Sequence, residues 1–260
     1  MIQLENVGVD RQGRSIIAGV STQLEAGKIH VIIGPNGTGK TTLLNAMFGE
    51  LALAQGQVRF AGQTLLPGKA RGKFLHGWRD TFAYLPQDTA ADIALTVLEV
   101  VVLGRLGKLS LHIDDETLAA AMERLEQAGI AHLAGRDIAS LSGGQRQMVL
   151  FAQVMMREPK AMLLDEPVSA LDLKHQISLL DLVRRETRAR DWVTVIVLHD
   201  LNLACQYADN LLVVAHGKIQ AAGHPRDVVT ENLIEKTYGV KVEVLTDRAG
   251  NPVIQPVSGI

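Results

Sequence analysis

The sequence predicts an α/β fold with a mainly parallel sheet in its core, an antiparallel β subdomain and a helical insertion. Three observations support this prediction. A glycine-rich loop separates an apolar run from the start of a helical pattern over residues 29–44 (IHVIIGPNGTGKTTLL). A second apolar run ends in two adjacent carboxylates over residues 161–167 (AMLLDEP). Strand-like and helical patterns then alternate through the second half of the chain, as is typical of a parallel sheet.

The first part of the chain predicts antiparallel strands. Residues 1 to about 28 alternate apolar and polar side chains around Gly13 and Gly27, and residues 57–65 (QVRFAGQTL) repeat the alternation. A period of two indicates strands with one buried face. Residues 67–80 are rich in glycine, lysine and arginine and predict an exposed loop, which is followed by a strand at residues 81–85.

Helical patterns dominate from residue 96 to about residue 139. Asp114, Asp115 and Glu116 are suited to the beginning of one helix and Gly129 to its end. Apolar runs at residues 161–164, 193–198 and 211–215 predict strands, and two alternating runs around DRAGNP (residues 247–252) predict a terminal hairpin. We therefore expect one domain, 1–260, in which residues 1–87 and 141–260 form the core with the β subdomain and residues 88–140 form the helical subdomain.

Composition excludes several classes of protein. The chain has 260 residues and is 47% hydrophobic, which suffices for a large core, and its net charge of −2 argues against a nucleic-acid partner. Its one cationic cluster, RRETRAR at residues 184–190, predicts the solvated face of a helix. The single Cys205 excludes an internal disulfide and is typical of a reducing compartment. No run of 18 apolar residues and no signal peptide occur, so we expect no membrane-spanning segment.

The glycine-rich loop predicts a phosphate site. Gly34, Gly39, Lys40 and Thr41 match the pattern G-x-x-x-x-G-K-[ST], with a strand before them and a helix after them. Glycines permit positive φ and let backbone N–H groups surround phosphate oxygens at the positive end of the helix dipole. Lys40 is expected to reach the β- and γ-phosphates and Thr41 to bind Mg²⁺. A glycine turn with a solvated lysine is the alternative, and the flanking strand and helix disfavour it.

Two further segments add chemistry to the same site. The carboxylates that end the second apolar run predict a strand beside that of the phosphate loop, with Asp165 binding Mg²⁺ through water and Glu166 facing the attacking water. The segment LSGGQ at residues 141–145 offers Ser142 as a helix N-cap and a glycine pair with free N–H groups, which is a second anion-binding helix start. Alone, these segments would indicate an acidic turn and an ordinary cap.

Together the segments resemble the nucleotide-binding subunit of ATP-binding cassette (ABC) transporters over nearly the whole chain. The resemblance is carried by GPNGTGKT (residues 34–41), Gln87 in YLPQD, LSGGQ, LLDEP, SALD (residues 169–172) and His199 in LHDLNLA, which occur in the family's order. It implies an ABC cassette fold and an ATPase. One alternative is a soluble cassette ATPase that acts on DNA or ribosomes, but such proteins carry a long coiled-coil insertion or two cassettes in tandem, and this sequence has neither. Another alternative is a phosphate-loop kinase, which LSGGQ and His199 disfavour because these features serve a cassette dimer.

The resemblance also implies that two copies pair head to tail, so that LSGGQ of one copy contacts the γ-phosphate bound to Lys40 of the other. Gln87 would sense Mg²⁺ and the γ-phosphate, and His199 would hold that phosphate and the attacking water. The catalytic residues are then Glu166, His199 and Gln87, and the Mg²⁺ ligands are Thr41, Gln87 and Asp165. The expected ATP contacts are Gly34, Pro35, Asn36, Gly37, Thr38, Gly39, Lys40, Thr41, Thr42, Arg11, Ser142, Gly143, Gly144, Gln145 and, at the dimer seam, Asp172.

Two positions depart from the family pattern. Arg11 stands where the family usually places an aromatic ring on adenine, and a guanidinium can stack on a base through a cation–π contact. Val168 stands where threonine is common, a minor change.

The helical insertion and the C-terminal third are similar to the importer cassettes for iron–siderophore, haem and cobalamin uptake. The similar stretches are TVLEVVVLGRLGK (residues 96–108), HDLNLACQYAD (residues 199–209) and YGVKVEVLTD (residues 238–247). This similarity implies uptake of an iron chelate, first a ferric siderophore, with haem or cobalamin as the alternative. It also implies polytopic permease subunits as partners, a substrate-binding protein as an indirect partner, and a peripheral location at the cytoplasmic face of the inner membrane.

Overall fold

A six-stranded sheet forms the centre of the protein, and all but one of its strands are parallel. The computed structural model describes residues 1–69, 71–87, 94–108 and 113–259. The strand order is β10-β9-β3-β8-β7-β6, with β10 antiparallel to β9. Every residue of β3, β7 and β8 is buried, as expected for a sheet covered on both faces. The strand bounds are β3 (Ile29–Ile33), β6 (Phe82–Leu85), β7 (Ala161–Asp165), β8 (Val193–Val197), β9 (Asn210–Ala215) and β10 (Lys218–Gly223).

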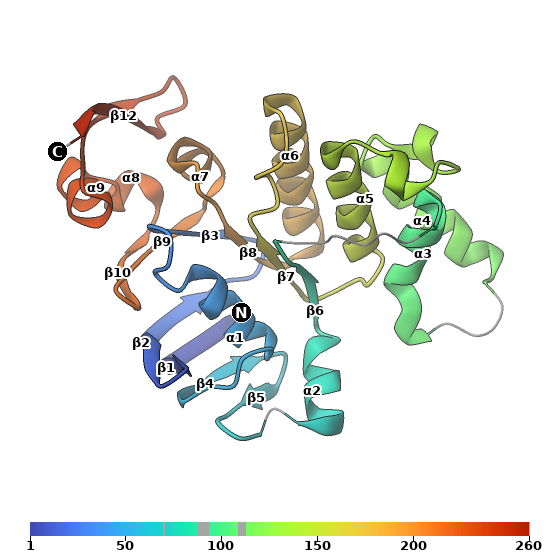
Figure 1. The fold of residues 1–260 in the computed structure, drawn as a ribbon, viewed down its shortest axis with the longest axis horizontal. Helices are drawn as coiled ribbons and strands as arrows, with labels where there is room; N and C mark the ends of the chain where they lie inside the picture. Colours follow the sequence, from blue (N-terminus) through green and yellow to red (C-terminus); the bar gives the residue numbers. More distant parts are fainter. Residues whose placement is uncertain (70, 88–93, 109–112, 260) are drawn as a thin grey trace.

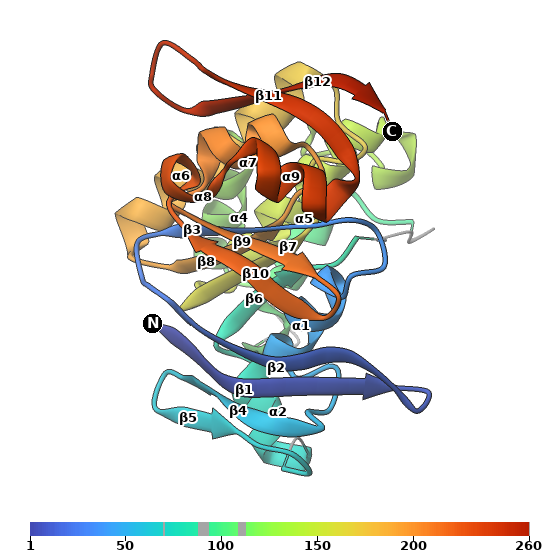
Figure 2. The ribbon, with the colours of Figure 1, turned by 90° about the vertical axis from the view of Figure 1, so that its left-hand side faces the viewer.

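The predicted antiparallel subdomain is a second, four-stranded sheet in the order β2-β1-β4-β5. Its strands are β1 (Ile2–Arg11), β2 (Arg14–Leu24), β4 (Gln55–Phe60) and β5 (Gln63–Leu65). Helix α1 (Lys40–Phe48), which follows the phosphate loop, lies between this sheet and the central one (Figure 2). Leu43, Leu44 and Met47 of α1 are buried in the core that the two sheets share. The predicted α/β fold is therefore confirmed.

The prediction of an exposed loop at residues 67–80 is wrong for its second half. Residues Gly72–Arg79 form helix α2, and Trp78 on this helix is 0% exposed. The indole N–H of Trp78 donates to the carbonyl of Met47 at 3.0 Å, and its ring stacks on Phe74. Phe74 and Trp78 are four residues apart and share one helix face, so their burial determines the structure despite the polar residues between them.

A helical layer lies beside the central sheet and contains the predicted insertion (Figure 1). Asp114 accepts a hydrogen bond from the N–H of Thr117 at 2.8 Å, and Gly129 has a φ of 72°, so the predicted helix begins and ends as expected. The subdomain boundary at residue 88 stays a prediction, because residues 88–93 lie outside the described residues. The layer comprises α3 (Val97–Val102), η1 (Leu103–Lys108), α4 (Asp115–Gln127), η2 (Ala131–Leu133), η3 (Ile138–Ser140), α5 (Gly143–Met155) and α6 (Leu173–Arg190).

The predicted terminal hairpin is present and packs against the last helices. Strand β11 (Val240–Thr246) pairs with β12 (Pro252–Gly259) in antiparallel register. The hairpin lies above α7 (Leu201–Tyr207) and α9 (Glu231–Tyr238), at the opposite end of the molecule from the antiparallel sheet (Figure 2). The sequence patterns did not predict β10, α9 or the short helix α8 (Pro225–Val228). No helix in the described ranges has the length and apolarity that a membrane span requires.

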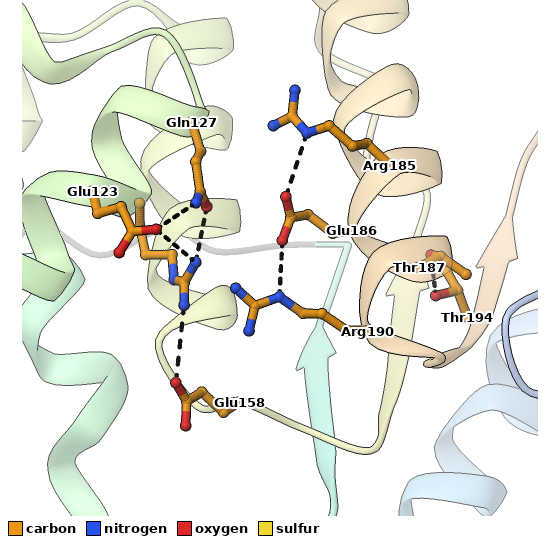
Figure 3. Close-up of polar contacts among 9 residues, drawn as sticks. Glu123, Gln127, Glu158, Arg185, Glu186, Thr187, Arg190 and Thr194 are labelled. Carbon is orange, nitrogen blue, oxygen red and sulfur yellow. Dashed lines mark hydrogen bonds and ion pairs between the residues drawn. The ribbon is translucent and has the colours of Figure 1, made fainter.

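The cationic cluster at residues 184–190 is solvated on one face only. Glu186 and Thr187 are buried on the other face of α6. Glu186 accepts hydrogen bonds from Arg190 Nε at 2.9 Å and from Arg185 Nε at 3.4 Å (Figure 3). On the facing helix α4, the buried Arg124 donates to Gln127 at 2.9 Å. Charged side chains therefore line the contact between α6 and the helical subdomain, where the sequence pattern indicated only solvent.

The pH dependence of stability is expected to depend on His30 in β3, which is 1% exposed. Its Nε2–H donates to the carbonyl of Glu25 at 3.0 Å, and its Nδ1 accepts from the amide of Asn210 at 3.1 Å. This pairing requires a neutral ring, and burial lowers the pKa of His30. In the unfolded chain the ring takes up a proton below about pH 6.5. The contribution of His30 to the free energy of unfolding is therefore fully present above about pH 6.5. Below that pH it falls by up to about 1.4 kcal/mol per pH unit, until the folded-state pKa of His30 is reached.

Denaturant unfolding of wild type and His30→Gln at pH 7.5 and pH 5.5 measures this contribution. Glutamine keeps a donor for the Glu25 carbonyl but does not titrate, so the variant should lose less stability on acidification. Equal losses in the two proteins would show that His30 does not set the acid sensitivity.

Candidate active site

The phosphate loop connects β3 to α1 and depends on its glycines. Gly34, Gly37 and Gly39 have φ values of 153°, 79° and 98°. A Cβ atom on Gly34 would lie 2.0 Å from the carbonyl oxygen of Val214, so no larger residue fits there. The loop thus adopts the tight conformation that the sequence pattern predicted, at the beginning of α1.

Lys40 is buried beneath this loop with its ammonium group held by two carbonyls. Its Nζ donates to Gly34 O at 2.8 Å and to Pro35 O at 3.0 Å. Burial lowers the pKa of Lys40, while the negative charges of Glu166 and Asp165 counteract the decrease. An ammonium group has three donors, so one remains for an anion at the loop. The lysine is therefore a preorganised cation at the predicted phosphate position.

The acidic strand β7 does not lie beside β3, and that prediction is wrong. Strand β8 separates the two, pairing with β3 on one side and with β7 on the other. The carboxyl ends of all three parallel strands still meet at one edge of the sheet, so the side chains reach one another. Thr41 at the start of α1 donates its hydroxyl hydrogen bond to Asp165 Oδ1 at 3.1 Å.

Asp165 is suited to hold a cation. It is 1% exposed, and its Oδ2 atom is buried without a hydrogen-bond partner in the described part of the chain. Burial raises the pKa of Asp165, and the hydrogen bond from Thr41 counteracts that shift. An orphaned carboxylate oxygen beside a threonine hydroxyl fits Mg²⁺, which prefers oxygen ligands and shares them with substrate phosphates. Among the described residues, no group of three or more His, Cys, Asp or Glu side chains is arranged to hold a metal ion by itself.

Glu166 contacts the two other predicted catalytic residues, Gln87 and His199. Its Oε2 accepts a hydrogen bond from Gln87 Nε2 at 2.9 Å, and its Oε1 contacts His199 Nε2. Its φ of 51° is in the left-handed region, which is strained for a residue other than glycine by about 1–3 kcal/mol. Gln87, Glu166 and His199 follow β6, β7 and β8, so the sheet edge brings together residues from three distant segments.

A cavity of about 490 Å³ joins these groups to the phosphate loop. Arg11 and Ile16 reach it from the β1–β2 hairpin, and the sequence patterns did not single out Ile16. Gly34, Pro35 and Thr38 are not among its lining residues, and Thr38 instead donates its hydroxyl to Pro35 O at 2.9 Å, which supports the loop. The lining residues are Arg11, Ile16, Asn36, Gly37, Gly39, Lys40, Thr41, Thr42, Gln87, Glu166 and His199.

The LSGGQ segment and Asp172 lie outside this cavity. Ser142 caps α5 in a reciprocal pair with Gln145, with N–H to side-chain oxygen distances of 3.3 and 3.2 Å. Asp172 caps α6 and accepts from the N–H of His175 at 2.9 Å. Ser142, Gly143 and Asp172 are exposed, and none of the predicted contacts from either segment lines the cavity. One chain therefore presents two separate parts of the predicted site.

Comparisons with known proteins agree with this geometry. The family profile described as "ABC transporter" matches residues 17–169. A hemin import ATP-binding protein of Mesorhizobium japonicum is 36% identical over 269 residues, with 100% of each chain covered. A cobalamin import ATP-binding protein of Halobacterium salinarum is 35% identical over 254 residues, covering 97% of this chain and 62% of its own length. A solved structure described as an "inward-facing conformation" of an ABC transporter of "metal-chelate type" has a TM-score of 0.84 at 26% identity, covering 99% of this chain and 97% of its own.

Proposed function

The chain belongs to the ATP-binding proteins of ABC transporters and is the ATPase of an importer, and from this premise we propose that it drives the uptake of haem. The supporting observation is similarity over the full chain length to a hemin import protein at 36% identity. Ferric siderophore, the cargo first expected from the sequence, has no such support. Cobalamin is the second candidate, because of the 35% identical cobalamin import protein.

In the proposed reaction, the loop amides and Lys40 bind the β- and γ-phosphates, and the buried ammonium group offsets their charge. Thr41, Asp165 and Gln87 would hold Mg²⁺, which supplies further charge neutralisation to the phosphates. Glu166 orients and polarises the attacking water, and its contacts with Gln87 and His199 fix the direction of its carboxylate. Catalysis of this kind consists mainly of positioning and electrostatic stabilisation.

We further propose that a second copy of the chain completes the site. The exposed cap of α5, with Ser142 and its glycine pair, offers free N–H groups to an anion. Because this cap lies outside the cavity of its own chain, its proposed ligand is the γ-phosphate bound to Lys40 of the partner. Asp172 would then lie at the seam between the two copies. Each dimer would contain two composite sites.

The remaining partners follow from the importer class. Cargo would pass through polytopic permease subunits supplied by other chains, and a substrate-binding protein would act only through them. We place the ATPase dimer at the cytoplasmic face of the inner membrane, bound to the permease. The cavity that we assign to ATP is lined by polar and charged groups suited to phosphates, so we expect haem to be bound by the partner proteins and not in this cavity.

Uptake in a strain that lacks this gene tests the cargo. Haem, cobalamin and a ferric siderophore are supplied separately, and haem uptake alone should fail and be restored by the wild-type gene. Restoration should not occur with Lys40→Ala. Loss of cobalamin or siderophore uptake with normal haem uptake would overturn the assignment of cargo but leave the ATPase assignment intact.

Replacing Arg11 with alanine should weaken ATP binding by a few-fold. Arg11 lines the cavity and is exposed, so a stacking contact with adenine is worth about 0.5–1 kcal/mol. Arg14 is the matched control, because it pairs with Arg11 across the same hairpin but does not line the cavity. Titration with ATP should give a raised dissociation constant for Arg11→Ala and an unchanged one for Arg14→Ala. Equal ATP dissociation constants in the two variants would show that a residue other than Arg11 contacts the adenine base.

A further inference from the structure

The last part of the chain packs against α7, the helix that follows His199. We call residues 231–259, which comprise α9, β11 and β12, the C-terminal element. Its hairpin is anchored in the core by Val242 and Ile254, which are 9% and 5% exposed. Figure 2 shows the hairpin above α7 and α9, and therefore outside the central sheet. Nothing in the proposed reaction uses this element directly.

One side chain, Asn202, joins α7 to β12. The N–H of Ile254 donates to Asn202 Oδ1 at 2.8 Å, and Asn202 Nδ2 donates to Ile254 O at 3.5 Å. The amide of Asn202 thus pairs with the backbone of β12 as a neighbouring strand would. Since Ile254 is buried, loss of this amide leaves its backbone groups without partners.

Helix α7 in turn fixes the segment that carries His199. Asp200 caps the helix and accepts from the N–H groups of Asn202 and Leu203 at 2.8 and 2.9 Å. On the other side of His199, the N–H of Leu198 donates to Ile32 O at 3.2 Å. His199 is therefore held between the end of β8 and the first turn of α7, the turn that Asn202 ties to the hairpin.

We propose that the C-terminal element positions the catalytic side of the ATP site, with Asn202 acting through His199. The inference rests on the proposed role of His199. Displacement of His199 should slow hydrolysis without weakening ATP binding, because the histidine acts on the γ-phosphate and water.

Steady-state ATPase kinetics of Asn202→Ala and Arg226→Ala test the contact of Asn202 with β12. Arg226 on α8 holds the other end of the same hairpin, donating to Ala249 O at 2.6 Å and to Asn251 Oδ1 at 3.5 Å. Both variants should lower Tm, because each releases one anchor. Only Asn202→Ala should lower kcat, by about five- to tenfold with KM unchanged, since small displacements of catalytic groups are costly.

One further variant keeps the test decisive. Asn202→Asp retains the oxygen that accepts from Ile254 and should keep most of kcat, even if Asn202→Ala folds poorly. Equal kcat in Asn202→Ala, Arg226→Ala and wild type would show that the C-terminal element is only a structural support. If Lys40→Ala also hydrolysed ATP normally, the site assignment itself would fail.

Discussion

Lys40→Ala is expected to abolish ATP hydrolysis and to weaken ATP binding. The substitution removes a buried ammonium group that bonds Gly34 O and Pro35 O, so the loop loses its internal support along with its charge. In a largely dissociative transition state the charge gathers on phosphate oxygens, and loss of a preorganised group at that point costs about a hundredfold or more in rate. Among single substitutions in this chain, we expect this to be one of the two largest effects.

Phosphate release and ATP titration measure the effect, with Lys28→Ala as the control. Lys28 immediately precedes β3, is exposed, and pairs with Glu25 at 2.7 Å. Removal of this lysine should leave both rate and affinity unchanged. Normal hydrolysis by a folded Lys40→Ala protein would show that the glycine-rich loop is not the phosphate site.

Glu166→Gln is expected to bind ATP, hydrolyse it very slowly and remain dimeric. Glutamine keeps the size of the side chain and one acceptor oxygen but removes the negative charge that polarises water. Binding should survive, because Lys40 and the loop are untouched. If ATP joins the phosphate loop of one copy to Ser142 of the other, blocked hydrolysis also blocks separation of the two copies.

Size-exclusion chromatography with light scattering, together with phosphate release, measures both consequences. Wild type should be mainly monomeric with ATP and Mg²⁺, whereas Glu166→Gln should elute as a dimer. Glu158→Gln is a matched control, because Glu158 has a similar φ of 48° and lies shortly after α5, outside the cavity. A monomeric Glu166→Gln protein with the wild-type rate would refute the catalytic role of Glu166.

Local sequence patterns predicted those parts of the fold that local forces determine. Runs of apolar residues identified β3, β7, β8 and β9, because strands covered on both faces are continuously apolar. Helix α2 was missed, because its glycine, lysine and arginine residues concealed the four-residue spacing of Phe74 and Trp78. Strand β10 was missed for a related reason, since it is an edge strand with little buried surface.

The sequence likewise predicted some features of the candidate site and missed those that depend on tertiary packing. Motifs predicted Gln87, Glu166 and His199, and the structure brings their side chains into contact. The insertion of β8 between β3 and β7 could not be predicted, because strand order depends on contacts between distant segments. The left-handed backbone of Glu166 and the orphaned oxygen of Asp165 also escape sequence patterns, since each arises from tertiary packing. The hydrogen bonds between Asn202 and Ile254 belong to this second group.

Head-to-tail pairing of two copies is the claim on which the proposed mechanism depends most, and thiol cross-linking tests it directly. Cysteines are placed at two exposed positions of the Glu166→Gln chain, by Asn36→Cys in the cavity and Ser142→Cys outside it. The native Cys205 does not interfere, because it is 2% exposed and burial raises its pKa to about 11. With ATP, Mg²⁺ and a short thiol cross-linker, we expect a species of twice the 28.1 kDa chain mass, which Lys40→Ala prevents. A cross-link within single chains, or no dimeric species at saturating ATP, would contradict the composite site.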